Sequence, residues 1–114
     1  MMRVTSGLWV GAFVRRCFSE GAMAAVVRHG ADEAGAILVV VDRLDETVDL
    51  YGQAPQSAFF DSRPADRLFQ LLLSQVARPE IERRLADESR FDPDLWVVEV
   101  EDRSGRAFLD LAET

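Results

Sequence analysis

The strongest constraint on the fold is the aliphatic run at residues 36–41, whose sequence is Ala-Ile-Leu-Val-Val-Val. β-Branched residues dominate this run and favour a β-strand. It is also the longest uninterrupted aliphatic stretch of the chain, and it falls far below the roughly 20 residues that a membrane-spanning helix needs. We therefore expect a domain that contains a β-sheet and does not span a membrane.

Length and cysteine content limit the domain further. With 114 residues, of which 48% are hydrophobic, the chain can build one core but not two, so residues 1–114 are predicted to form a single domain. Its one cysteine, Cys17, cannot form an intramolecular disulfide, and this favours a reducing compartment, which we take to be the cytoplasm. Cys17 itself is predicted to be a small core residue.

The net charge of −7 disfavours binding to nucleic acid, because the field of the whole molecule repels phosphate groups. The charge is also uneven. Residues 1–30 hold four arginines against one acid, whereas residues 61–114 hold eight arginines against thirteen acids. These basic and acidic ends could meet within one chain or between two copies. All basic residues are arginine, which excludes a Schiff base, a phosphate-loop lysine and a lysine general base.

The N-terminal stretch predicts a helix. Thr5 or Ser6 can cap its start, and Gly21 supplies a left-handed stop. Between these signals, apolar residues recur at helical spacing: Leu8, Trp9, Ala12, Phe13 and Cys17.

Three antiparallel strands are predicted to follow. Residues 23–28 are small or β-branched, and we expect them to pair with residues 36–41 as a hairpin. A third strand at residues 48–51 alternates apolar positions with Asp49, which predicts one face toward solvent. Residues 52–62 lack a clear apolar period and are expected to be a connecting loop.

The middle of the chain predicts one or two helices. Ser62 and Pro64 suit the start of a helix. The apolar residues that follow at a period of 3.6 are Leu68, Phe69, Leu72 and Val76. Pro79 is expected to kink or restart this helix, because proline interrupts a helix interior.

The last segment predicts a β-hairpin. Residues 95–101 and 107–111 flank Ser104 and Gly105, which suit a two-residue turn. Pairing outward from this turn gives one apolar face and one face that carries acids. The whole chain is thus predicted to be an α+β domain with an N-terminal helix and an antiparallel or mixed sheet of about five strands, with one or two helices packed on one face.

Several stretches of sequence are distinctive as a set: residues 92–103, Gly105 with Arg106, residues 8–10, Arg15 with Arg16, and residues 28–36. They resemble an alphaproteobacterial domain-of-unknown-function family, domain of unknown function 1491. The resemblance spans nearly the full chain, although residues 52–85 offer no motif to match. It implies a stand-alone bacterial domain and implies no activity, because none is known for that family.

Acidic residues around the last predicted strand form the most site-like cluster: Asp92, Asp94, Glu99, Glu101 and Asp110. Carboxylates two residues apart on a strand share a face, so Asp94, Glu99 and Glu101 could bind a hard cation such as Mg²⁺ or Ca²⁺. The alternative is a solvated sheet face whose charge Arg103 and Arg106 partly neutralise.

Two further sets of residues could carry chemistry. His29 is the only histidine and therefore the obvious candidate for a general acid or base, although a lone loop histidine is more often solvated. Arg15, Arg16 and Arg28 could bind an anionic ligand, a hypothesis that depends on the charge asymmetry alone.

The aromatic residues are expected to lie mostly in the core. Trp9, Phe13 and Trp96 occur at regular positions of predicted elements. Phe59 and Phe60 fall in a loop-like stretch, where they either cap the core or form an exposed apolar patch, and we favour core capping.

The leading functional hypothesis is a non-catalytic interaction or ligand-binding domain, with self-association as a homodimer and no cofactor. In this hypothesis the turn at residues 92–94 delivers Trp96 into the core, and the charged residues that follow form a polar face. The candidate binding residues are Asp92, Asp94, Trp96, Glu99, Glu101, Arg103 and Arg106. The alternative is a small metal-dependent enzyme with Asp94, Glu99 and Glu101 as ligands and His29 as proton carrier.

Overall fold

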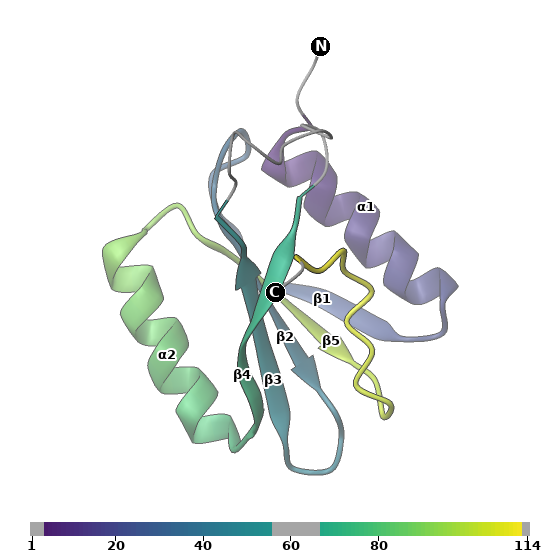
Figure 1. The fold of residues 1–114 in the computed structure, drawn as a ribbon. Helices are drawn as coiled ribbons and strands as arrows, with labels where there is room; N and C mark the ends of the chain where they lie inside the picture. The colour runs from purple at the N-terminus through teal and green to yellow at the C-terminus, as the bar shows by residue number, and fades with distance from the viewer. Residues whose placement is uncertain (1–3, 56–66, 113–114) are drawn as a thin grey trace.

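The computed structural model describes residues 4–55 and 67–112 and folds them into two helices and one five-stranded sheet (Figure 1). In chain order the elements are α1 (Ser6–Ser19), β1 (Met23–Arg28), β2 (Ile37–Asp42), β3 (Val48–Gln53), β4 (Phe69–Val76), α2 (Arg78–Phe91) and β5 (Trp96–Glu101). The predicted α+β class and the predicted number of strands are confirmed. Among these described residues, neither helix has the length and apolar character needed to cross a bilayer.

The strand order is β1-β5-β2-β3-β4, so the last strand of the chain lies inside the sheet between β1 and β2. Strand β5 runs antiparallel to β1 and parallel to β2, while β2, β3 and β4 are antiparallel neighbours. The sheet is therefore mixed. The aliphatic run that forms β2 occupies its centre, where five of the six strand residues are buried.

Helix α1 begins and ends where the sequence signals predict. The Thr5 hydroxyl accepts a hydrogen bond from the backbone N–H of Leu8 at 3.2 Å and so caps the first turn. Gly21 follows the helix with φ of +89°, a left-handed conformation that glycine adopts without steric cost. The buried stripe of α1 includes Val10, Phe13 and Cys17.

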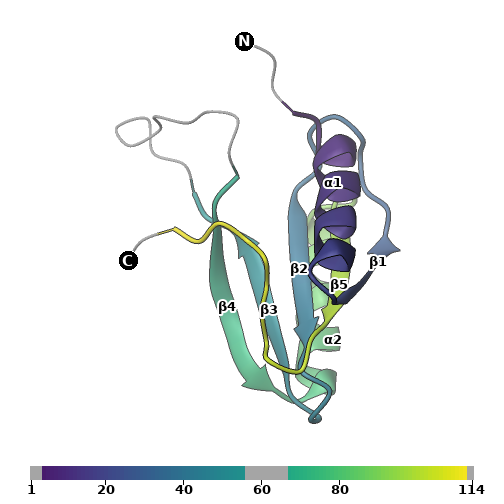
Figure 2. The same ribbon diagram turned by 90° about the vertical axis from the view of Figure 1, so that its right-hand side faces the viewer.

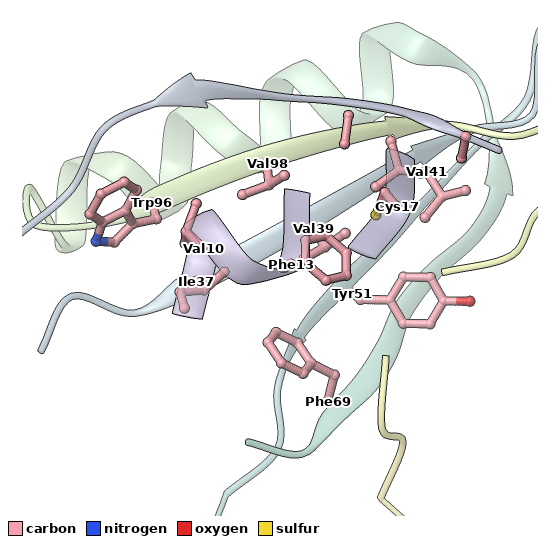
Figure 3. Packing of buried hydrophobic residues seen from close by; sticks show 13 residues of the cluster. Val10, Phe13, Cys17, Ile37, Val39, Val41, Tyr51, Phe69, Trp96 and Val98 are labelled. Atoms are coloured by element: carbon pink, nitrogen blue, oxygen red, sulfur yellow. The ribbon is translucent and has the colours of Figure 1, made fainter. Parts of the chain in front are cut away.

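Each face of the sheet carries a helix. Alternate residues of β2 point to opposite sides, and both sides are apolar, so each side needs cover. On one side α1 packs against a cluster that includes Val39, Trp96 and Val98 (Figure 3). On the other side Ile81 of α2 packs with Leu38, Val40, Leu50 and Val97. The prediction that the helices cover one face is therefore wrong.

Two predicted hairpins do not form. One was expected between residues 23–28 and 36–41, the other between residues 95–101 and 107–111. Strands β1 and β2 do not pair with each other, because β5 lies between them and uses both of its edges. With both edges of β5 occupied, residues 107–111 cannot pair with it either. The turn itself forms, since Gly105 has φ of +73° and donates its N–H to the Asp102 carbonyl at 2.9 Å. The chain then leaves the sheet plane and packs Phe108 and Leu109 against the α1 side.

The predicted helix at residues 68–76 is in fact the edge strand β4. It pairs with β3 through Leu50 and Leu73, and through Gln53 and Phe69, with a register shift on each side of Leu50. The shifts interrupt the two-residue alternation, which is why the apolar residues imitate a helical period. Ser62 and Pro64, expected to start that helix, lie outside the described residues, as do Phe59 and Phe60.

Helix α2 starts later than predicted, at Arg78, with Pro79 in its first turn, where proline is tolerated. The predicted restart at Pro79 is therefore the beginning of the helix. Strand β3 is also longer than expected, because Gly52 and Gln53 of the predicted loop belong to it. The expectation that β3 exposes one face is wrong, since Asp49 is only 1% exposed.

Candidate functional site

The predicted turn at residues 92–94 forms and has a structural role. The Asp92 carboxylate accepts the N–H of Asp94 at 3.0 Å, and the Asp92 carbonyl accepts the N–H of Leu95 at 3.3 Å. The turn leads directly into Trp96, which is 3% exposed and donates its indole N–H to the Ala31 carbonyl at 2.7 Å. Trp96 is thus a core residue, as Figure 3 shows.

The loop after β1 closes around this turn. Ala31 donates its N–H to the Asp94 carbonyl at 3.0 Å. A Cβ on Gly30 would lie 2.2 Å from that carbonyl oxygen, and one on Gly35 would lie 2.3 Å from it, so only glycine allows the approach. Two distinctive stretches of sequence, around residues 28–36 and 92–96, are therefore the two halves of one packed contact.

His29 lies against this contact and away from the acidic face of β5. Its ring centroid is 4.2 Å from that of Trp96, and its side chain is 68% exposed. Trp96 points to the α1 side of the sheet, whereas Glu99 points to the α2 side about 10 Å further along the strand. The structure therefore does not bring His29 to the acids that it was expected to serve as proton carrier.

The acids of β5 converge with a residue that the sequence analysis missed. Carboxylate oxygens of Asp42, Glu99 and Glu101 all lie within 4.8 Å of one another. Asp42 ends β2 and stands directly beside Glu101, because β2 and β5 are parallel neighbours. Asp94 lies in the turn before the other end of β5, so the predicted ligand set of Asp94, Glu99 and Glu101 is not assembled.

An arginine already neutralises much of this cluster. Arg78, the first residue of α2, donates to the Asp42 carboxylate at 2.8 Å and to the two Glu99 carboxylate oxygens at 2.9 and 3.0 Å. The hydrogen bonds to Glu99, and the charge of Glu99 and Asp42, raise the pKa of the Arg78 guanidinium. The arrangement is an ion-pair network that fastens the start of α2 to the sheet.

The other predicted basic partners lie elsewhere. Arg106 contacts Asp102 instead of the acidic face, with its Nε at 3.1 Å and its Nη2 at 2.8 Å from the carboxylate oxygens. These hydrogen bonds hold the pKa of the Asp102 carboxyl below its ordinary value. Arg103 is exposed on the turn that precedes the C-terminal segment. Arg78, rather than Arg103 or Arg106, is thus the counter-charge of the acids.

The β1 edge is an exposed and mainly apolar surface, which the sequence analysis had assigned to a hairpin. Five of the six β1 residues are exposed, among them Met23 at 58%, Val26 at 42% and Val27 at 57%. Strand β1 has one neighbour in the sheet, β5, on its inner side. Its apolar residues could have been recognised as an edge only once β5 was placed between β1 and β2.

Comparisons with known proteins find relatives over the whole chain. Residues 4–110 match the family model described as protein of unknown function, DUF1491. The solution structure of protein Atu0922 from A. tumefaciens is 43% identical, covers 99% of this chain and 98% of its own, and has a TM-score of 0.85.

Two structures of a DUF1491 family protein from Caulobacter crescentus CB15 are also similar to this chain. The crystal structure is 36% identical with a TM-score of 0.79, covering 99% of this chain and 100% of its own. The NMR structure is 35% identical with a TM-score of 0.80, covering 100% of both chains. None of the curated proteins matches.

Proposed function

Because the chain belongs to the DUF1491 family, for which no function is known, we propose a function from its own surface: a non-catalytic interaction domain that pairs with a second copy through the β1 edge. The observation that carries this proposal is the exposure of β1. This mainly apolar strand lies at one edge of the sheet, whereas the interior strands are covered. An edge strand offers a row of backbone donors and acceptors to another strand, and exposed apolar side chains favour its burial.

The charges at the two ends of β1 favour an antiparallel pair of identical strands. Arg28 pairs with Val97 and Met23 pairs with Glu101, so Arg28, Met23 and Glu101 all lie on the α2 side of the sheet. A two-fold axis near Ala25 brings Arg28 of each copy beside Met23 of the other. Glu101 stands next to that position, across from the Arg28 guanidinium, which within its own chain donates to the Pro93 carbonyl at 3.2 Å.

Helix α1 enlarges this surface. It packs directly beside β1, and its last turn exposes Phe18, three residues before the turn glycine Gly21. A strand pair alone falls short of the roughly 800 Å² per partner of a standard interface, so a second contact layer is needed. Two α1 helices that meet across the same axis provide it.

The test is the molar mass in solution over a range of concentrations, by sedimentation equilibrium. The wild-type mass should rise from 12.8 kDa toward twice that value. Val26→Lys should stay at 12.8 kDa, because it places a charge on the shared edge. Leu71→Lys is the matched control, since Leu71 has similar exposure on the opposite edge strand β4, and this variant should dimerise like the wild type.

Two outcomes contradict the proposal. A wild-type protein that stays monomeric at every concentration shows that β1 does not pair with itself. A dimer that Val26→Lys leaves intact shows that another surface makes the contact. Circular dichroism of each variant confirms that the lysine has not unfolded the domain.

The metal-dependent alternative is less well supported. Its proton carrier does not reach the acids, and Arg78 already supplies a cation at Asp42 and Glu99. The proposal also includes a cytoplasmic location, which the buried free thiol of Cys17 supports.

A further inference from the structure

A cavity of about 130 Å³ lies on the α1 side of the sheet, between α1 and the C-terminal segment. Figure 2 shows that segment in yellow as it crosses the strands on the side where α1 lies. The lining residues are Trp9, Ala12, Phe13, Arg16, Arg67, Phe108, Leu109 and Asp110. The cavity shares no residue with β1 and does not include Phe18, the two features assigned to the proposed dimer contact.

The inner wall of the cavity is aromatic. The Trp9 ring stacks on Phe13 with centroids 5.0 Å apart and an angle of 10° between the planes. It also lies 5.2 Å from the Phe69 ring. Phe13 and Phe69 are buried, whereas Trp9 is only partly buried and faces the cavity. This wall presents a flat, apolar surface to a bound ring.

The opposite wall is held in place by the C-terminal segment. Phe108 has φ of +59°, a left-handed conformation that is costly for a residue with a bulky side chain. The segment is fixed on both sides of it: Arg106 binds Asp102 and lies 4.9 Å from the Phe108 ring, and Phe69 donates its N–H to the Asp110 carbonyl at 2.9 Å. The cavity walls are therefore formed before any ligand binds.

The rim of the cavity carries an arginine, Arg16, that can bind an anionic group. Arg16 lies one helical turn after Ala12 and Phe13, is exposed, and makes no ion pair within the described part of the chain. Arg67 is different, because its guanidinium donates to the Val4 carbonyl at 2.9 Å. Asp110 on the same rim repels anions, which restricts an anionic group to the Arg16 side.

We propose that this cavity binds a small aromatic carboxylate. The ring lies between Trp9 and Phe108, and the carboxylate accepts hydrogen bonds from the Arg16 guanidinium. A space of about 130 Å³ holds one substituted ring and is well below the roughly 300–1,000 Å³ of pockets for drug-sized ligands. This ligand class uses both features of the site, its flat apolar walls and its single available cation.

The first experiment is a titration of the ¹⁵N-labelled protein with benzoate, followed by NMR. The Trp9 indole N–H and the backbone amides of Phe108 and Leu109 should shift together and saturate. Benzamide, which has the same shape without the charge, should bind about tenfold more weakly because it loses the charge-assisted hydrogen bonds to Arg16. Cyclohexanecarboxylate, which keeps the charge but is not flat, should also bind more weakly.

Matched variants separate specific binding from attraction to a basic helix. Arg16→Gln should weaken benzoate binding about tenfold, whereas Arg15→Gln should leave it unchanged, because Arg15 does not line the cavity. Ala12→Leu should also weaken it by filling the cavity from an exposed helix position that tolerates leucine. Val26→Lys should bind benzoate like the wild type.

Each of the following results overturns the proposal: no saturable shifts with benzoate, equal affinity for benzoate and benzamide, or equal losses in Arg15→Gln and Arg16→Gln. A loss in Val26→Lys has the same meaning, since it would place the site at the β1 edge instead.

Discussion

The two edge strands of the sheet, β4 and β1, differ in how their outer edges are covered and in which residues they expose. At the β4 edge, the C-terminal segment crosses the start of the strand: Phe69 donates its N–H to the Asp110 carbonyl at 2.9 Å, and Ala112 donates to the Phe69 carbonyl at 2.8 Å. Further along, exposed Gln70, Ser74 and Gln75 make the strand polar. At the β1 edge the exposed residues are mainly apolar, and Arg28 is the one charged residue of the strand.

This difference is the reason that the proposed dimer uses β1 and not β4. Proteins protect an edge strand with polar residues, irregular backbone or a covering segment, because an unprotected edge associates with other strands. The β4 edge has all three, including two register shifts against β3 and a left-handed Gln75 at φ of +51°. The β1 edge has one irregularity, between Val26 and Arg28, which leaves residues 23–26 regular.

The largest expected effect on stability comes from truncating Phe69, the residue through which β4 contacts the C-terminal segment. Phe69→Ala should lower the free energy of unfolding by about 4 kcal/mol, because the fully buried ring leaves a cavity beneath Trp9 and the C-terminal segment. Val26→Ala, on the open edge, should cost less than about 1 kcal/mol. Urea denaturation of the two variants below their association concentration measures both values, and equal losses would show that the edges do not differ as described.

The end of β4 depends on a buried carboxylate. Asp49 accepts hydrogen bonds from the Arg43 guanidinium at 2.9 Å and from the Gln75 N–H at 2.7 Å. Asp49→Ala leaves both donors without this partner and should cost about 3 kcal/mol. Asp49→Asn keeps one acceptor oxygen and should cost less. If urea denaturation gives the same stability for both variants and the wild type, this contact does not hold the edge.

The sequence was sufficient where local signals decide the structure. The Thr5 cap, the apolar stripe and Gly21 together predicted α1, and β-branched runs predicted β1 and β2. The sequence was insufficient where partners are distant. No local pattern shows that β5 enters between β1 and β2, and that single event converts two predicted hairpins into a mixed sheet.

The same limit applies to the candidate site. Glu99 and Glu101 were recognised as neighbours because they are two residues apart on one strand. Asp42 and Arg78 join them only through the parallel pairing of β2 with β5 and the position of α2, so sequence spacing could not reveal them. The turn before Trp96 was predictable, because Asp92 and Pro93 favour a turn locally.

Cys17 of helix α1, the helix beside the β1 edge, is expected to lower the stability of the domain at high pH. Burial raises the pKa of the Cys17 thiol from 9.0 to about 11, so the folded state favours the neutral form. This contribution to stability is complete below about pH 9 and is lost as the pH rises to about 11, a loss of roughly 2 kcal/mol. Urea denaturation at pH 8 and pH 11 should show a smaller decrease for Cys17→Ala than for the wild type, and identical decreases would contradict the assignment to this thiol.

The smallest expected effect is the most direct comparison of the two edges, since it leaves the chain unchanged. If β1 pairs with a second copy, the amides of β1 that point away from β5 exchange with solvent only from the unpaired fraction of the protein. Their exchange should slow about fivefold once four fifths of the chains are paired, while β4 amides keep the same rate at every concentration. Hydrogen exchange followed by NMR at low and high protein concentration measures this ratio. In Val26→Lys the β1 amides should lose their concentration dependence, and a dependence shared by both edges would assign association to another surface.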